Sequence, residues 1–268
     1  LRGTAMAAIT LSTLKDFKTK GEKFSMLTCY DSSFAKLMNT AGIEVLLIGD
    51  SLGNVLQGHN STLPVTLEDI AYHTASVRRG NTNALIVAAL PFLPDPSLPK
   101  LLETSAALMR AGANLVKIEG GAWSAKGIKK LTQRGIPVCA HLWLSPQMVN
   151  SFGGYRVQGR GEADELLIKA AKKLEKAGAA AILLECVPSE LGTAVTQAVS
   201  CPVIGIGAGA DTDGQVLVLH DMLGITQGKV AKFVKNFMEE ASSIQEAISN
   251  YHLAVKNGSF PAEEHCFQ

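Results

Sequence analysis

The sequence lacks the features of several large protein classes. None of its apolar runs approaches the ~20 residues that a membrane-spanning helix needs. Lys and Arg number 25 against 24 Asp and Glu, and no basic block is interleaved with aromatic residues, as nucleic-acid binding would favour. The start of the chain shows no basic segment followed by a secretory apolar core. We therefore expect a cytoplasmic protein that binds neither membranes nor nucleic acids.

Cysteine is scarce and is not patterned for a metal or for disulfides. The five cysteines lie mostly inside apolar runs, and no pair has CxxC spacing. A disulfide framework and a zinc knuckle are therefore both disfavoured, and we expect buried thiols. The 268 residues, 47% of them hydrophobic, suffice for one large core. We expect a single domain over residues 6–268, preceded by LRGTA (1–5), which we interpret as a tag remnant.

Short β-rich runs alternate with longer amphipathic stretches along the chain. Three of these stretches end in the Ala-Gly pair that is typical of a helix C-terminus. Eight strand and helix units, without a GxGxxG fingerprint after the first run, favour a closed (β/α)8 TIM barrel over an open Rossmann sheet. A helical region over about 229–256 is expected to complete the ring. The expected strands span 24–31, 45–50, 84–92, 115–121, 137–144, 180–188, 201–209 and 216–223.

Polar residues gather where the expected strands end. In a TIM barrel these C-terminal ends converge on one mouth, which holds the active site. Lys117 and Glu119 are two positions apart, so in a strand they project from the same face. For His141, polarising a substrate oxygen and hydrogen bonding inside the barrel are both open. The complete set is Asp31, Asp50, Ser51, Lys117, Glu119, His141, Glu185, His220 and Asp221.

The number of acidic groups predicts a bound cation. Each residue taken alone is more often structural, but burying several ionised groups is unfavourable unless they pair or bind a metal. One lysine cannot neutralise Asp50, Glu119 and Glu185 together. Oxygen ligands favour Mg²⁺ or Mn²⁺, and a 2-oxo acid would chelate such an ion. Glu185 could then remove a proton from the carbon next to the ketone, which would prepare a C–C bond.

Longer motifs point to a family. They are VLLIGDSLGNVLQGHNSTLPVTLEDIAYHTASVRRG, RAGANLVKIEGG, IPVCAHLWLSPQ, FGGYRVQGRG, LLECVP and PVIGIGAG, followed by the terminal PAEEHCF. In this order they resemble the 3-methyl-2-oxobutanoate (ketopantoate) hydroxymethyltransferase family, among the barrels of the phosphoenolpyruvate mutase and isocitrate lyase type. The resemblance implies hydroxymethyl transfer from 5,10-methylenetetrahydrofolate to 3-methyl-2-oxobutanoate, which gives 2-dehydropantoate in pantothenate biosynthesis. It also implies one Mg²⁺ per subunit and a cytoplasmic homodecamer.

The resemblance also implies a role for each matching residue. Asp50 of GDS would be a magnesium ligand that also meets the substrate, and Ser51 would touch the substrate carboxylate. Glu119 of KIEGG would belong to the magnesium shell, directly or through water. Lys117 would bind the substrate, with His141 as a further substrate-binding candidate. Glu185 of LLECVP would be the general base.

Two positions depart from the family pattern. Where the family has ADLPF, with the aspartate as a further metal ligand, this chain has Ala89, which supplies no oxygen. Where the family has a glycine after HL, this chain has Trp143, which would narrow the route of the folate or fold back into a loop. We expect weaker magnesium binding and low turnover, since even outer-shell losses cost ~10- to 100-fold in affinity or activity. The glycine-rich segment 151–161 is a candidate loop over the mouth.

Other functions are considered beside the leading hypothesis. Ala89 and Trp143 motivate a catalytically silent homologue that only binds a 2-oxo acid. A Mg-dependent C–C lyase of the isocitrate lyase type would use similar carboxylates, but the KKCGH-like loop characteristic of that group does not occur in this sequence. A Schiff-base aldolase using Lys117 is the third possibility.

Overall fold

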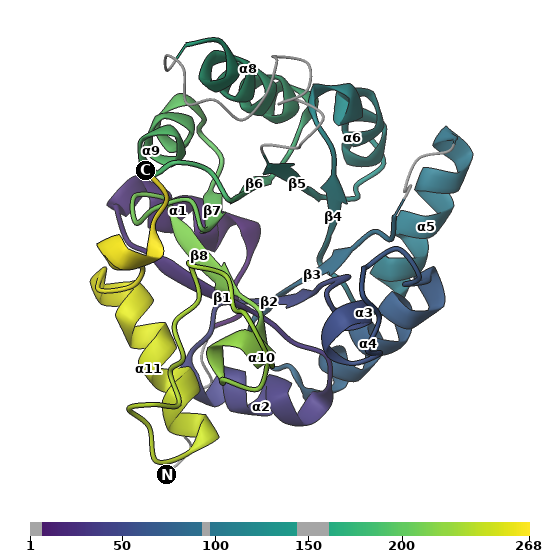
Figure 1. Ribbon diagram of the computed structural model, residues 1–268. Coiled ribbons are helices and arrows are strands. Elements are labelled where there is room, and N and C mark those ends of the chain that lie inside the picture. The colour runs from purple at the N-terminus through teal and green to yellow at the C-terminus, as the bar shows by residue number, and fades with distance from the viewer. Residues whose placement is uncertain (1–6, 93–96, 144–160) are drawn as a thin grey trace.

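Eight parallel strands close into a barrel in the order of the chain, from β1 through β8 and back to β1 (Figure 1). The computed structural model describes residues 7–92, 97–143 and 161–268. The prediction of a (β/α)8 barrel is confirmed. The strands are β1 (Phe24–Thr28), β2 (Val45–Ile48), β3 (Leu85–Ala89), β4 (Leu115–Glu119), β5 (Val138–Trp143), β6 (Ala181–Glu185), β7 (Val203–Ile206) and β8 (Gly214–Leu217).

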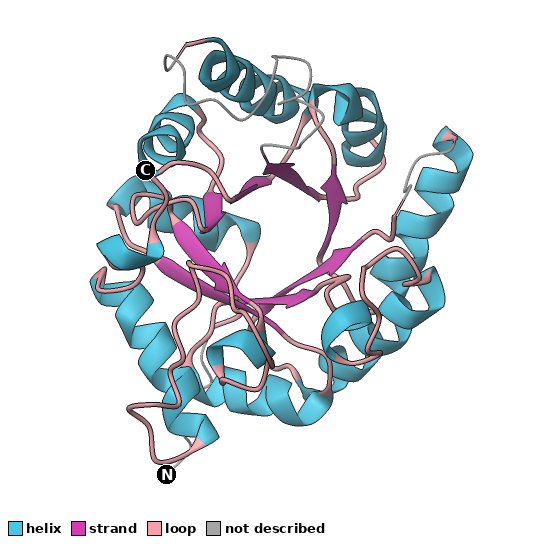
Figure 2. Ribbon diagram, viewed as in Figure 1, coloured by secondary structure: helices cyan, strands magenta, loops and turns pink. Residues whose placement is uncertain are grey.

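Helices form a ring outside the strands (Figure 2). The Ala-Gly pairs do end helices: Gly42 caps α2 and Gly178 caps α8, both with left-handed backbones that suit glycine (φ 89° and 112°). The helices are α1 (Leu11–Lys20), α2 (Ser32–Ala41), α3 (Leu52–Val55), α4 (Leu67–Gly80), α5 (Leu98–Ala111), α6 (Ala125–Thr132), α8 (Glu162–Ala177), α9 (Ser189–Ala198), α10 (Leu219–Met222) and α11 (Ile244–Asn257), with short 3-10 turns η1 (Ala122–Ser124) and η2 (Glu263–His265).

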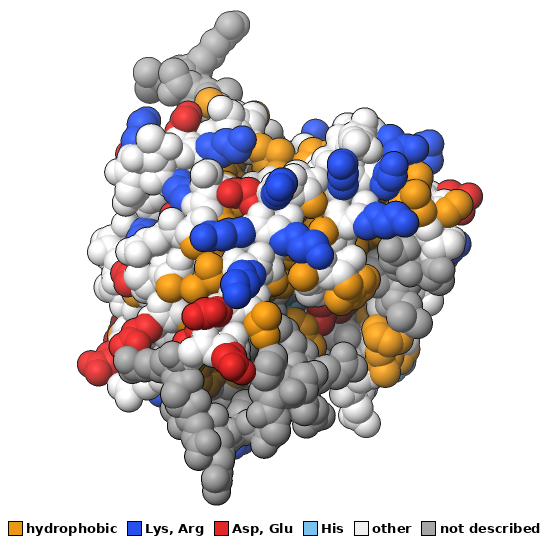
Figure 3. All heavy atoms as spheres, turned by 90° about the horizontal axis from the view of Figure 1, so that it is seen from above, with side chains coloured by type: hydrophobic (Ala, Val, Ile, Leu, Met, Phe, Trp, Pro, Cys, Tyr) orange, Lys and Arg blue, Asp and Glu red, His pale blue; other side chains and the backbone are white. Residues whose placement is uncertain are grey.

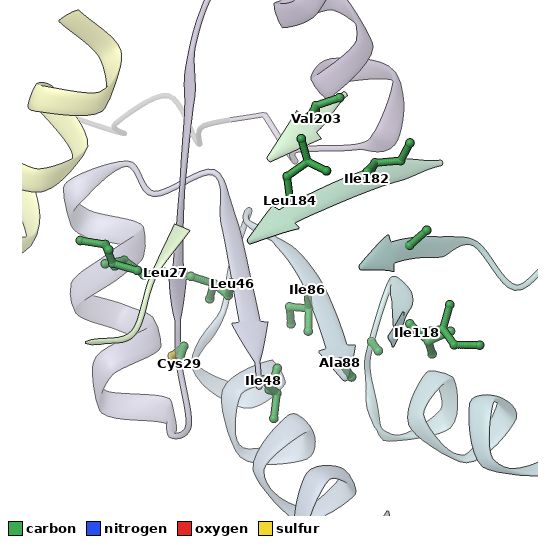
Figure 4. Packing of buried hydrophobic residues seen from close by; sticks show 14 of the residues in the cluster. Leu27, Cys29, Leu46, Ile48, Ile86, Ala88, Ile118, Ile182, Leu184 and Val203 are labelled. Atoms are coloured by element: carbon green, nitrogen blue, oxygen red, sulfur yellow. The ribbon is translucent and has the colours of Figure 1, made fainter. Parts of the chain in front are cut away.

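The strands are buried on both faces, because one face lines the barrel and the other meets the helices. Leu27, Leu46 and Ile86 belong to the outer cluster, and Figure 4 shows this packing against the helices. Their alternate neighbours Met26 and Val45 belong to a second cluster inside the barrel. Continuous apolar strands of this kind are typical of a parallel sheet covered by helices. The same alternation decides which polar residues reach the interior of the mouth.

The helix α1 closes the end of the barrel opposite the mouth. Leu14 belongs to the inner cluster, and Ile9, Leu11 and Phe17 pack against it. The Phe17 ring stacks on that of Phe24 at the start of β1, with centroids 6.3 Å apart. Solvent is thereby excluded from the base, so the inner pocket opens at the mouth.

Charge on the outer surface follows the helices. On α8, Leu167, Ala171 and Leu174 are buried, whereas Lys172 and Lys173 are exposed. Figure 3 shows the outer face of the molecule with its Lys and Arg side chains standing among apolar ones. This amphipathic pattern is that of a helix with one face on the core.

Two sequence expectations about the last unit were wrong. The eighth strand is β8 at Gly214–Leu217 and not 216–223, because the chain turns into α10, where the Leu219 N–H donates to Thr28 Oγ1 (2.9 Å). The C-terminal helix begins only at Ile244, where Ser243 accepts a hydrogen bond from the Glu246 N–H. Within residues 226–243 the chain is turn and loop.

Some expectations lie outside the described residues, namely the tag remnant at 1–5 and all but the last residue of the mouth-loop candidate at 151–161. Of the helices that the structure describes, none has the length and apolar character needed to cross a bilayer.

Candidate active site

Six of the nine polar residues predicted for the mouth line one cavity of about 320 Å³. We call it the mouth pocket. Leu115 lies inside the barrel, so alternation along β4 turns Lys117 and Glu119 inward as well. On β5 the same rule turns Cys139, His141 and Trp143 inward. The predicted residues that line the pocket are Asp50, Ser51, Lys117, Glu119, His141 and Glu185, together with Trp143.

Three of these side chains form a chain of contacts across neighbouring strands. Lys117 on β4 is only 5% exposed, and its Nζ lies 3.3 Å from Nδ1 of His141 on β5. On the other side of the imidazole, Nε2 lies 3.0 Å from Oε2 of Glu185 on β6. The latter contact has the length of an ion pair but not the alignment of a hydrogen bond, because Nε2 has no hydrogen-bond partner among the described residues.

Lys117 favours one of the two neutral forms of His141, whose Nδ1 also lies 3.7 Å from Glu119 Oε2. An ammonium group only donates hydrogen bonds, so Nδ1 is the acceptor of the contact with Lys117. In the neutral ring the proton then sits on Nε2, which faces Glu185. This buried N–H can also reach a substrate oxygen, as expected of a donor left without an aligned partner.

The surroundings keep Glu185 ionised. Burial alone would raise the pKa of this carboxyl, but the contact with His141 and the positive charge of Lys117 outweigh burial and hold the pKa below its ordinary value. The side chain is still 38% exposed, so a substrate can reach it. Glu185 is therefore an accessible carboxylate that can accept a proton at neutral pH.

On the opposite side of the pocket, Ser51 is held by a buried tyrosine. The Tyr30 hydroxyl and Ser51 Oγ are 2.7 Å apart. Burial raises the pKa of Tyr30 to about 12, so the phenol stays protonated and can donate to Ser51. Below the polar rim the pocket is apolar, with Leu47, Leu183 and Val216 among its lining residues.

Comparison with known proteins identifies the family of this chain. Residues 8–263 match the sequence profile of the family described as ketopantoate hydroxymethyltransferase. The chain belongs to the ketopantoate hydroxymethyltransferase family. The 3-methyl-2-oxobutanoate hydroxymethyltransferase of Stutzerimonas stutzeri is 62% identical over 264 residues, covering 98% of this chain and 99% of that protein. The Marinobacter nauticus protein of the same name is 59% identical over 262 residues, covering 97% and 99%.

Solved structures confirm the type of barrel. Phosphoenolpyruvate phosphomutase from Streptomyces platensis subsp. rosaceus superposes with a TM-score of 0.61 at 12% identity, covering 80% of this chain and 82% of that one. A 2,3-dimethylmalate lyase, described as a phosphoenolpyruvate mutase/isocitrate lyase superfamily member, superposes with a TM-score of 0.57 at 15% identity, covering 77% and 80%. At such low identity the likeness concerns the fold alone.

This member of the ketopantoate hydroxymethyltransferase family offers few oxygen ligands for a metal in the mouth pocket. Asp50 and Glu119 both line the mouth pocket, but Ala89 is 1% exposed and offers a methyl group beside Lys117, its register partner. Within the described ranges, no three His, Cys, Asp or Glu side chains are grouped to hold an ion. Mg²⁺ is commonly held by one or two carboxylates, with waters and substrate oxygens completing the shell. By type and number the two carboxylates are compatible with Mg²⁺, and Ala89 adds no oxygen to them.

Three predicted residues have structural contacts instead and do not line the pocket. Asp31 caps α2 by accepting from the Phe34 N–H (2.8 Å). Asp221 accepts from Thr226 Oγ1 (2.6 Å), and the His220 ring packs against Tyr30 with centroids 5.7 Å apart. Both lie on α10 because the chain leaves the barrel earlier than we expected.

Sequence reasoning missed Thr28, Asn54 and Thr62 in the pocket wall. Thr28 could have been found, because it shares the inward face of β1 with Phe24 and Met26. Asn54 and Thr62 lie in the segment between β2 and α4, whose path no periodicity reveals. For these two residues the sequence carried no usable signal.

Proposed function

We propose that this chain transfers a hydroxymethyl group from 5,10-methylenetetrahydrofolate to 3-methyl-2-oxobutanoate, giving 2-dehydropantoate and tetrahydrofolate. Membership of the ketopantoate hydroxymethyltransferase family supports the overall reaction. The observation that carries the mechanism is the contact chain Lys117, His141 and Glu185, which ends in an ionised, accessible carboxylate inside the mouth pocket.

The keto acid would lie between the two polar sides of the pocket. Lys117 is a buried ammonium whose hydrogen bond in the described structure goes to His141, so it has further donors for the oxygens of an anionic substrate. Ser51, held by Tyr30, would donate to the carboxylate from the other side. The branched end of the substrate would then face Leu183 and Val216.

Glu185 would act as the general base. Its carboxylate would take the proton from C3, the carbon next to the ketone, and the electron pair of the broken C–H bond would move toward the keto oxygen. The Nε2–H of His141 faces Glu185, and it would keep the carboxylate oriented. C3 would then bond to the methylene carbon of the donor, whose two C–N bonds break while water supplies the hydroxyl group. The proton taken by Glu185 and the second proton of the water would pass to the two folate nitrogens, and tetrahydrofolate would leave.

Asp50 and Glu119 would hold Mg²⁺ in this proposal. A bound Mg²⁺ would supply Lewis acidity that makes the C3 proton easier to remove. Since Ala89 contributes no oxygen, we expect weak metal affinity and a low rate. A cytoplasmic location and a homodecamer stay predictions from the family resemblance.

Turnover is the direct test of this function. The chain, 3-methyl-2-oxobutanoate, methylenetetrahydrofolate and Mg²⁺ should yield 2-dehydropantoate, detected by mass spectrometry, and EDTA should stop its formation. Calorimetry with the keto acid and Mg²⁺ provides the companion measurement. Binding without product would favour the silent homologue over the transferase.

Two further outcomes would favour the other enzymes. Covalent trapping of the keto acid on Lys117 by borohydride, with activity that survives EDTA, would indicate Schiff-base chemistry. Cleavage of a substituted malate or citrate, without hydroxymethyl transfer, would indicate a lyase. Neither has an observation in its favour as specific as the match to the transferase family.

A further inference from the structure

Trp143 presents an indole inside the mouth pocket. It is the last residue of β5, shares the inward face with His141, and lines the cavity, so it does not fold away from the mouth. The side chain is 37% exposed. Within the described part of the chain it has neither an aromatic partner nor a cation over its ring. A large aromatic surface is therefore left available in a site that is otherwise polar at its rim.

The strand register places this indole beside the general base. Trp143 and Glu185 are paired positions of β5 and β6. In the reaction proposed above, the carbon that loses its proton to Glu185 is the carbon that bonds to the one-carbon unit. The donor must therefore bring its methylene group, and the ring that carries it, to the side of the pocket where Glu185 lies.

The keto acid gains less from contact with the indole than the folate does. The branched end of a small keto acid has apolar contacts in Leu183 and Val216, which line the pocket and belong to the cluster inside the barrel. A flat bicyclic heterocycle, in contrast, binds well on an exposed aromatic face, since stacked rings gain area and dispersion in a fixed geometry.

We propose that Trp143 is the platform on which the pteridine ring of the reduced folate stacks, next to Glu185. This assignment rests on the proposed function and adds the subsite of the second substrate to it. The indole then orients the donor for attack instead of blocking its entry. It makes Trp143 a substrate-contacting residue specific to the folate and not to the keto acid.

Tryptophan fluorescence tests the contact directly, because the chain has only two tryptophans. Trp123→Phe leaves Trp143 as the only tryptophan, which can be excited without the tyrosines, and 5-formyltetrahydrofolate serves as a stable reduced folate. Its binding should quench this emission, whereas p-aminobenzoylglutamate, which lacks the pteridine, should not. Quenching that is retained in Trp143→Phe but absent from Trp123→Phe would overturn the proposal.

Calorimetry with the same ligand measures the size of the effect. Trp143→Gly should weaken 5-formyltetrahydrofolate binding by about tenfold, as expected for loss of one stacking contact. Trp143→Phe should lose only part of that affinity, because a smaller ring remains. Affinity for 3-methyl-2-oxobutanoate with Mg²⁺ should change less than about twofold in either variant, and Trp123→Phe should match the unchanged chain.

The results separate this inference from the proposed function. Unchanged or tighter folate binding in Trp143→Gly, while the parent chain binds folate, would overturn the platform and leave the transferase intact. Failure of the parent chain to bind reduced folate at all, while it binds the keto acid, would overturn both.

Discussion

The mouth and the base of the barrel carry similar side chains that differ in solvent exposure and in hydrogen bonding. At the mouth, Lys117, His141 and Glu185 lie in contact, but Nε2 of the histidine has no aligned partner among the described residues and the carboxylate is 38% exposed. At the base, beside α11, Glu44 and His252 form a comparable cluster with a lysine and a serine, and there the carboxylate is only 7% exposed.

Both carboxylate oxygens of the base cluster are occupied. Glu44 Oε2 accepts from both the backbone N–H and the Oγ–H of Ser25 (2.8 Å each), and Oε1 accepts from Lys256 (2.8 Å). Ser25 Oγ is also 2.7 Å from His252 Nδ1. The residue types are those of a hydrolase triad, but Ser25 is 0% exposed, so no substrate reaches its hydroxyl.

The difference between the ends shows that access and unfilled hydrogen bonds mark a reactive site better than residue type does. A buried polar network that satisfies all its members fixes structure, whereas a network with an unmatched donor and an accessible base is arranged for a ligand. The comparison predicts that substitutions at the mouth change the reaction and those at the base change stability.

The largest expected effect is that of Glu185→Gln. Removal of a positioned general base should lower kcat by roughly 10²- to 10⁴-fold, because the amide cannot accept the proton. The melting temperature should hardly change, since the side chain is 38% exposed and keeps its shape. Steady-state kinetics and calorimetry measure the two quantities. A kcat within about threefold of the unchanged chain would remove Glu185 from the mechanism.

Glu44→Gln is the matched change at the base. It should lower the free energy of unfolding by about 2–3 kcal/mol, because Ser25 and Lys256 lose the charged acceptor that they share. For a chain of this length the melting temperature should fall by roughly 5–10 °C. kcat per folded molecule should stay the same at a temperature where both proteins are folded. A variant that loses activity without losing stability would contradict the division between the ends.

Ala89→Asp should strengthen the metal site of the mouth. The new carboxylate would lie beside Lys117 on the inward face, with Asp50 and Glu119 in the same pocket. We expect Mg²⁺ affinity to rise at least about tenfold, or ~1.4 kcal/mol, measured by calorimetry without substrate. Adding Asp50→Asn to this variant should cancel the gain. Equal affinity in Ala89→Asp and in the unchanged chain would show that Ala89 is harmless to metal binding.

The sequence predicted the barrel because strand and helix patterns agree with it locally, from the apolar β4 run to the Gly42 and Gly178 caps. It also predicted that polar residues gather at the mouth, and six of the nine do line one pocket, because alternation within strands and convergence at the mouth are general rules. It failed for the last unit, where the hydrogen bond from Leu219 to Thr28, 191 positions away, ends β8.

Contacts between distant residues also explain what could not be predicted at the site. The tautomer of His141 depends on Lys117, 24 positions away, and the pairing of Tyr30 with Ser51 depends on how two strand ends meet. Nothing in the pattern of residues 51–66 indicates that Asn54 and Thr62 reach the pocket. The periodicity of a sequence identifies the inward face of a strand, but it does not give the path of the chain between strands.

The smallest expected effect is the dependence of folding stability on pH, to which the base cluster contributes. Burial lowers the pKa of His252, the negative charge of Glu44 raises it and the positive charge of Lys256 lowers it, so that the pKa lies below its ordinary value. The unfolded chain therefore takes up this proton at a higher pH than the folded chain does, so the contribution of His252 is complete above about pH 6.5 and is lost as the pH falls. Glu185, whose pKa lies below the ordinary 4.5, stays ionised over the same interval.

Between pH 7.5 and 5.5 we accordingly expect urea denaturation to show a loss of stability, to which the base contributes through His252. His220 and His265 also have pKa values lowered by burial, so the share of His252 is the difference between the unchanged chain and His252→Gln. That variant should lose less stability over the interval, while kcat, corrected for the folded fraction, should depend on pH in the same way in both proteins. An equal loss in the two would show that the base cluster does not respond to pH, and a difference between their kcat profiles would show that the two ends are coupled.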